Sequence, residues 1–201
     1  MGLLSTSLAQ VDALSWGQLV AVAALGVAIG LAVWVAWAFN RLVRRHNLVR
    51  EGWSGIDVQL KRRHDLVPNL VEAVKGYAGH EHEVLEEVVA LRGKAEALQD
   101  RKALRESENQ ITSRLQRVFA LAEDYPDLKA DRNFRQLADQ LVEIEDALQY
   151  ARRYYNGATR DFNITVESFP SNLVARGFRF TLADYFEIAV ATERSAPKVK
   201  L

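Results

Sequence analysis

The sequence of 201 residues contains no cysteine and only one methionine. The absence of cysteine excludes disulfide bonds, thiolate zinc sites and a cysteine nucleophile. Basic and acidic residues balance at 26 each, so the chain lacks the basic excess that nucleic-acid binding needs. Phosphate-binding glycine loops and Ser-His-Asp arrangements are missing as well. The sequence therefore predicts no catalytic residue, no cofactor and no nucleic-acid partner.

Charge is also missing from one long stretch. Leu19 to Phe39 is a run of 21 residues without a charged side chain, a proline or a side-chain amide. A helix of this length covers about 30 Å, the thickness of the hydrocarbon core of a bilayer. A cleaved signal peptide is the alternative, but no basic residue precedes the run, and the apolar part of such peptides is shorter, about 7–15 residues. Residues 19–39 are therefore predicted to form a transmembrane helix.

The basic residues near the membrane all follow the apolar run: Arg41, Arg44, Arg45 and Arg50. This asymmetry predicts that the C-terminal side faces the cytoplasm and that residues 1–18 form a short extracytoplasmic N-terminus. The same arginines could bind anionic lipid headgroups. The sequence leaves open whether they do so or only set the topology.

Gly26 and Gly30 lie four residues apart within the apolar run. Such spacing of small residues lets two membrane helices approach closely, so this pair is a candidate helix–helix interface. The alternative is that glycine is simply common in membrane helices.

Beyond the membrane, residues 40–190 show helical periodicity and no competing strand. One helix face is marked by residues that recur at spacings of three and four: Val49, Trp53, Ile56, Leu60, His64 and Val67. No Gly/Ser/Pro-rich linker precedes this face, so the membrane helix is expected to continue directly into it. The stretch from Asp65 to Pro68 is predicted to end the helix, and a kink at Pro68 is the open alternative.

Three further helical segments follow. The face from Val67 to Leu98 is weakened by Gly76 and Gly79, and the next helix is expected to end near Tyr125-Pro126. The longest seam runs from Phe134 to Phe169 and stops at Pro170. A shorter aromatic segment, Leu173 to Ile188, precedes a disordered tail at residues 191–201.

Together these segments predict an all-α protein: an N-terminal transmembrane helix followed by an antiparallel four-helix bundle with a short C-terminal helix. An intermolecular coiled coil is the alternative for the longest helix.

A dense group of polar residues surrounds the buried face between Trp53 and Glu72. We interpret it as a candidate partner surface made of Asp57, Gln59, Arg62, Arg63, Asn69 and Glu72. A charged network that sets helix register is the alternative interpretation. An acid or base role for Asp57 or Glu72 is disfavoured because no nucleophile or metal cluster accompanies them.

Histidine and asparagine raise two smaller hypotheses. His80 and His82 are two residues apart, so on a helix they point to different faces and make a poor metal site. His46, His64 and His82 fall on the predicted seams, where a hydrogen-bonded histidine is the common explanation. Asn156 and Asn163 share a helix face and form either a buried amide ladder or an exposed pair.

The sequence resembles the LemA family of bacterial membrane proteins over nearly all of the chain after Gly17. The resemblance is carried by an N-terminal membrane helix followed by Trp53-Ser54-x-Ile56-Asp57-Val58-Gln59-Leu60-Lys61-Arg62-Arg63-x-Asp65-Leu66-Val67-Pro68-Asn69-Leu70-Val71-Glu72, Lys75-Gly76-Tyr77-Ala78-x-His80-Glu81, Tyr125-Pro126-Asp127-Leu128-Lys129-Ala130, Ala151-Arg152-x-x-Tyr155-Asn156 and Phe169-Pro170-Ser171-Asn172. Gly55 and the stretch Arg176-Gly177-Phe178 depart mildly from the pattern.

The resemblance implies a helical bundle on a single-pass anchor in the bacterial cytoplasmic (inner) membrane, with no enzymatic activity and no cofactor. Family members have been linked to membrane remodelling and to membrane-protease neighbours, which is an argument by analogy. The first functional hypothesis is a non-enzymatic scaffold that contacts membrane lipid and forms homo-oligomers or binds partners at the membrane surface. The alternative is an adaptor for a membrane protease or other envelope machinery.

Overall fold

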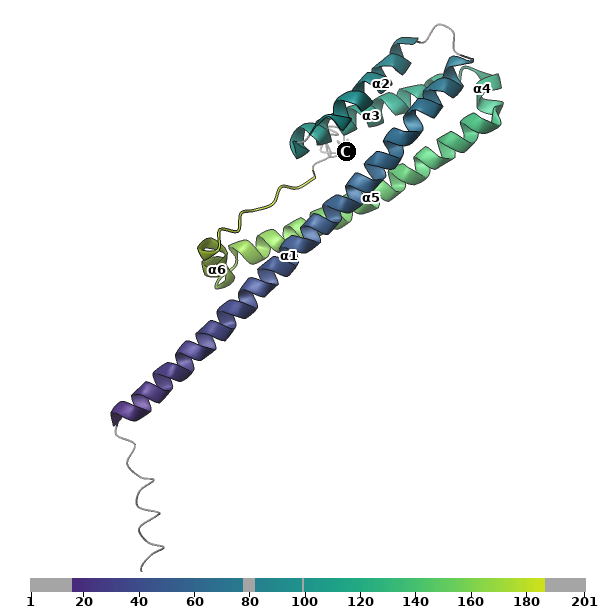
Figure 1. Cartoon of the computed structure of the whole chain (residues 1–201). Coiled ribbons are helices and arrows are strands. Elements are labelled where there is room, and N and C mark those ends of the chain that lie inside the picture. The colour runs from purple at the N-terminus through teal and green to yellow at the C-terminus, as the bar shows by residue number, and fades with distance from the viewer. Residues whose placement is uncertain (1–15, 78–81, 99, 187–201) are drawn as a thin grey trace, which may run out of the picture. The chain divides into compact units, whose positions relative to one another are not determined.

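The computed structural model of the chain describes residues 16–77, 82–98 and 100–186 (Figure 1). Within these ranges all regular secondary structure is helical, which confirms the predicted all-α class. The helices are α1 (Trp16–Lys75), α2 (His82–Glu96), α3 (Arg101–Ala122), α4 (Pro126–Ala130), α5 (Arg132–Glu167) and α6 (Ser171–Gly177). The predicted tail at 191–201 and residues 1–15 lie outside the described residues.

The chain divides into two compact units. Unit 1 combines Met1–Arg45 with Phe162–Leu182, and unit 2 combines His46–Asp161 with Ala183–Leu201. Helices α1 and α5 each contribute residues to both units.

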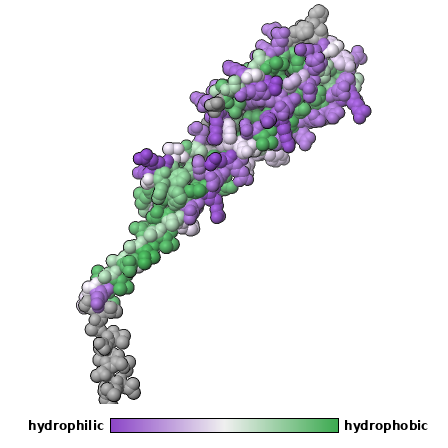
Figure 2. All heavy atoms as spheres, in the orientation of Figure 1, coloured by the Kyte–Doolittle hydropathy of each residue, from purple (hydrophilic) through white to green (hydrophobic). Residues whose placement is uncertain are grey.

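In unit 1, the N-terminal part of α1 exposes its apolar side chains, as the hydrophobic colouring of Figure 2 shows. By length and composition α1 is able to cross a membrane, and it is the only helix of the described residues that qualifies. A Cβ atom placed at Gly26 or Gly30 would have no neighbouring atom within 4 Å, so this face of the helix is open. The continuity of α1 through Asn40 confirms that the apolar run passes directly into the next helix.

The predicted helix end at Asp65–Pro68 is wrong, because α1 passes through Pro68 and ends at Lys75. Proline inside a helix removes one backbone hydrogen bond and costs about 3 kcal/mol. The side chain of Pro68 is exposed, and the carbonyl group that loses its helical donor is that of His64, four residues earlier. On either side, Val67 and Leu70 are fully buried, and their burial offsets the cost.

The helix boundary lies instead after Lys75, where the sequence pattern indicates only a weakening. Gly76 and Tyr77 form a turn, and α2 begins at His82. Two glycines within four residues, Gly76 and Gly79, each lower helix stability by about 1 kcal/mol and bring no side chain to a core. Among the described residues that follow Lys75, Gly76 and Tyr77 are both exposed, so no burial there favours a longer α1.

One apolar core of unit 2 draws on five helices. It is made of Val67, Leu70, Val71 and Val74 of α1, Leu85, Val88 and Ala95 of α2, Ile111, Leu115, Val118 and Ala122 of α3, Leu128 of α4, and Phe134 and Leu141 of α5. These residues carry the three-and-four spacing of the sequence. Their shared burial confirms the predicted helix faces.

Two aspartates start helices in unit 2. The carboxylate of Asp100 accepts a hydrogen bond from the backbone of Ala103 at 2.8 Å and caps α3. The carboxylate of Asp131 accepts one from Phe134 at 2.8 Å and caps α5. Between them, α3 ends at Ala122 and Pro126 opens the short helix α4, close to the predicted boundary.

The predicted C-terminal helix from Leu173 to Ile188 is too long, since α6 ends at Gly177. Arg179 takes a left-handed conformation with φ of 58°, and the amides of Arg179 and Phe180 donate to the carbonyl groups of Arg176 and Ala175. This is a Schellman motif, which ends a helix. Residues 178–186 are therefore not helical. Phe169, predicted as the last seam residue of α5, is also outside the helix and 80% exposed.

Candidate functional site

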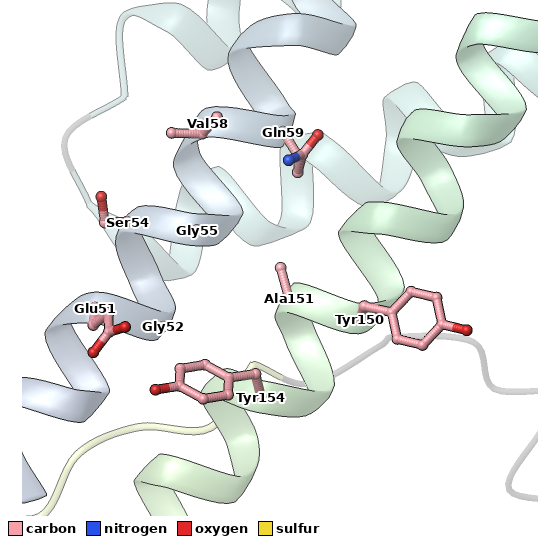
Figure 3. Close-up of a pocket in the computed structure, with 9 residues that line it drawn as sticks. All are labelled: Glu51, Gly52, Ser54, Gly55, Val58, Gln59, Tyr150, Ala151 and Tyr154. Carbon is pink, nitrogen blue, oxygen red and sulfur yellow. The ribbon is translucent and has the colours of Figure 1, made fainter.

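A hollow of about 670 Å³ opens between α1 and α5 in unit 2 (Figure 3). The α1 side has small residues, Gly52, Ser54 and Gly55. The α5 side contributes the rings of Tyr150, which is 68% exposed, and Tyr154. The remaining lining residues are Glu51, Val58, Gln59 and Ala151. We call this hollow the tyrosine groove.

Gly52 also sets the distance between the two helices. A Cβ atom at this position would lie 2.9 Å from the Cα atom of Tyr155 and 3.1 Å from the ring of Tyr154. Both distances are shorter than an ordinary van der Waals contact. Only glycine therefore allows α1 and α5 to approach this closely.

A second hollow of about 330 Å³ adjoins the tyrosine groove, because Gln59 lines both. Its polar walls come from Arg62 and Asp65 of α1 and from Gln140 and Glu143 of α5. The other lining residues are Leu66, Ile144 and Ala147. We call it the polar hollow.

The predicted partner surface is only partly brought together. Gln59 and Arg62 line the hollows, whereas Asp57, Asn69 and Glu72 are exposed on α1 but line neither of these two. That a partner binds here stays a prediction.

Arg63 does not belong to an accessible surface, which corrects its place in the predicted set. Its side chain is 1% exposed. Arg63 follows Arg62 by one residue, and the helical turn of about 100° carries it to the seam between α1 and its neighbours. The charged network that the sequence leaves as an alternative is thus the role of this arginine.

The partners of Arg63 come from α3 and α5. Its Nη2 atom donates to the carboxylate of Glu108, and Nη1 donates to Thr112 at 2.7 Å and to Glu145 at 3.1 Å. His64 Nε2 lies 2.7 Å from the other carboxylate oxygen of Glu108. Glu108 is fully buried, so both of its oxygens are satisfied by protein groups.

Arg152 extends this buried network along α5. Its Nη1 atom lies 3.8 Å from Glu145, and its guanidinium stacks over the ring of Phe186 at 4.8 Å. Burial lowers the pKa of Arg152, and the neighbouring Glu145 opposes that shift. The two arginines and two glutamates balance, which keeps the interior free of excess charge.

The electrostatics of Glu108 make stability depend on pH. Burial alone would raise the pKa of Glu108, but the hydrogen bond from His64 and the charge of Arg63 lower that pKa below its ordinary value of 4.5. The stabilisation is therefore complete above about pH 4.5 and is lost as pH falls through the depressed pKa.

We expect the free energy of unfolding to decrease as the pH is lowered below 4.5. Glu108→Gln should remove part of this pH dependence. Urea unfolding at several pH values, followed by circular dichroism, measures this. Glu106→Gln, an exposed position on the same helix, is the control and should keep the slope. Equal slopes in both variants would exclude the contribution of Glu108.

The sequence gives no prediction for Glu108 or Glu145 and shows Arg152 only within a family motif, although a signal for Glu108 is present. Glu108 lies three residues before Ile111, on the same face as the apolar seam of α3. A charged residue at a seam position requires a buried partner. The pairing with Arg63, 45 residues away, depends on how the helices pack and has no local signal.

The end of the described chain packs within unit 2 through Phe186, which is 2% exposed. The Asn156 side chain pairs with the backbone of Phe186, donating to its carbonyl group at 3.0 Å and accepting from its amide at 2.7 Å. Tyr155 donates to the carbonyl group of Asp184 at 2.7 Å, and Trp53 contacts the rings of both Tyr155 and Phe186. Asn156 therefore holds the backbone at Phe186 through two hydrogen bonds and is not part of an amide ladder.

The histidine predictions have mixed outcomes. His64 is buried and hydrogen-bonded, as expected on a seam. His46 is exposed although it shares a helix face with the buried Leu42 and Val49, so its predicted place on a buried seam is wrong. His80 and the side chain of His82 lie outside the described residues. In the described part of the chain, no three potential ligands group as a metal site would require.

The chemistry of the two hollows suits recognition of a protein surface. Exposed tyrosines beside small residues are typical of protein interfaces, where aromatic rings bury large areas with few rotatable bonds. Arg62, Asp65 and Glu143 add charges of both signs that could orient a partner.

This chain has relatives among known proteins. A family model described as the LemA family matches residues 52–201. Protein LemA of Metamycoplasma hominis is 29% identical over 138 residues, covering 68% of this chain and 63% of that protein. Magnetosome protein MamQ 2 of Paramagnetospirillum magneticum is 26% identical over 175 residues, covering 74% of this chain and 64% of that protein. The match thus spans just under two thirds of each relative's length.

Proposed function

Because the chain belongs to the LemA family, we propose that it is a non-enzymatic, membrane-anchored helical scaffold that self-associates at the membrane surface. Family membership and the apolar part of α1 suggest a membrane-anchored bacterial protein. We further propose that the helices around the core of unit 2 form the antiparallel four-helix bundle that the sequence predicts, and that this bundle lies in the cytoplasm.

The tyrosine groove is the observation that carries this proposal. Tyr150 is mostly exposed, and Val58 and Tyr154 are about half exposed, beside small residues of α1. Apolar groups left in water at one place gain free energy when a second surface covers them, about 25 cal/mol per Å². A second copy of the chain is always available at the membrane, where the anchor confines all copies to one plane.

The membrane helix offers a second contact between copies. The space beside Gly26 and Gly30 is open, and the neighbouring residues of α1 are exposed. Small residues four apart allow close packing of two such helices. Helix α1 continues without a break through Lys75. Its residues therefore contribute both to the contact in the membrane and to the tyrosine groove.

We expect the full-length protein in mild detergent to have a mass of several chains by light scattering. The double variant Tyr150→Ser/Tyr154→Ser should lower this mass, because exposed tyrosines are typical centres of binding energy. Val142→Ser is the matched control, since Val142 is similarly exposed on α5 and lines neither hollow.

Further variants separate the membrane contact from the groove. Gly26→Leu combined with Gly30→Leu should reduce the mass if the membrane helices pair, whereas Ala21→Leu, on the opposite face of α1, should not. A chain that begins at Asn40 should remain associated if the groove suffices. Monomers of the full-length protein would exclude self-association and leave the adaptor function, in which a different protein occupies the groove.

A further inference from the structure

We propose that residues 168–182, which we call the turn segment, form a second membrane contact that inserts apolar side chains into the lipid interface beside the end of the apolar run. The inference rests on the proposed membrane anchoring and adds the lipid surface as the partner of this segment. The turn segment belongs to unit 1 together with the apolar part of α1 (Figure 1).

Aromatic contacts place the turn segment at the level where the apolar run ends. The ring of Phe39, the last residue of that run, lies 4.7 Å from the ring of Phe178 and 5.9 Å from that of Phe180. Phe180 also contacts Phe162 of α5 at 6.3 Å. When residues 19–39 span the hydrocarbon core, Phe178 and Phe180 are therefore held at its boundary.

The neighbouring residues of α1 mark the same boundary. Trp37 is exposed, and the guanidinium of Arg41 lies over its ring at 5.5 Å. Tryptophan and arginine at the end of an apolar helix are typical of the membrane–water interface. Ala38 is buried in unit 1, so one face of this last turn is covered by protein and the other remains open to lipid.

The turn segment exposes large apolar side chains where a soluble domain would hide them. Phe169, Leu173, Phe178 and Leu182 are each more than half exposed. Meanwhile α6 buries Val174 and Ala175, so its inner face is already occupied and Leu173 points outward. Such a concentration of exposed apolar groups marks an interaction surface.

The charge of the segment selects lipid over other partners. Residues 168–182 contain two basic residues, Arg176 and Arg179, and no aspartate or glutamate. Both arginines are exposed. Apolar side chains accompanied by basic residues are the composition of elements that lie in the interface of anionic membranes.

The absence of cysteine permits a direct test with the full-length protein in vesicles of phosphatidylcholine and phosphatidylglycerol. Leu173→Cys is labelled with an environment-sensitive fluorophore, and a fraction of the lipid carries a nitroxide quencher near the headgroup. We expect blue-shifted emission and loss of fluorescence with the quencher present. Leu25→Cys in the apolar run is the control for anchoring, and Val142→Cys is the exposed control of unit 2.

Each outcome decides the inference. Quenching at position 25 but not at position 173 would overturn the lipid contact and leave the anchor intact. Quenching at neither position would overturn both the contact and the proposed anchoring. A blue shift at position 173 without quenching would mean that protein covers the segment, which also overturns the lipid contact.

Discussion

Replacing Glu108 with glutamine should destabilise unit 2 by roughly 3–5 kcal/mol, the usual cost of removing one partner of a buried ion pair. The carboxylate accepts from Arg63 on one oxygen and faces His64 on the other. Glutamine keeps only one acceptor oxygen, so its amide group must face one of these donors. Arg63 would retain Glu145 alone as a charged partner.

Urea unfolding of the full-length protein in detergent, followed by circular dichroism, measures this effect. Glu106→Gln makes the same chemical change two residues earlier on the exposed face of α3, and we expect it to cost at most about 0.5 kcal/mol. If Glu108→Gln were as mild as this control, the network would contribute little to stability.

A double variant tests whether the charge pair is needed for stability. Arg63→Met combined with Glu108→Leu replaces the pair with apolar groups, and such replacements are often neutral or stabilising. We expect the double variant to recover most of the loss of Glu108→Gln.

Gly52→Ala should destabilise the contact between α1 and α5 by about 1–3 kcal/mol, the typical cost of overpacking. The new methyl group would meet the backbone of Tyr155 at 2.9 Å, and a backbone atom in a helix cannot move aside alone. The helices must separate, which also disturbs the contact of Trp53 with Tyr155 at 5.6 Å.

Gly55→Ala is the matched control, one turn further along the same helix. No atom lies within 4 Å of the new methyl group, so alanine should stabilise α1 by about 1 kcal/mol through its higher helix propensity. The two substitutions thus differ in sign, and unfolding in urea compares them directly. Equal stabilisation by both would contradict the close approach of the helices.

The seams of the long helices are predictable because they depend only on spacing along the chain. Ile56, Leu60 and Val67 of α1, like Ile111 and Leu115 of α3, are buried as their period requires. Local chemistry also places the end of α3 near Pro126, since proline cannot continue a helix but can begin one.

Where two local signals compete, the strength of the tertiary contacts decides. Pro68 by itself predicts an end of α1, but burial of Val67 and Leu70 carries the helix past it. Gly76 and Tyr77, the described residues that follow Lys75, are exposed, and the helix ends after Lys75.

By itself the sequence determined the all-α class, the apolar segment at residues 19–39, the buried faces of the helices and the family. These follow from composition, periodicity and motifs, which are properties of the linear sequence. Only the tertiary structure decided that Arg63 is buried against Glu108, that Gly52 sets the distance to Tyr155 and that Phe186 is fastened by Asn156. Each of these contacts joins residues far apart in sequence, and their partners are chosen by helix packing, which no local pattern encodes.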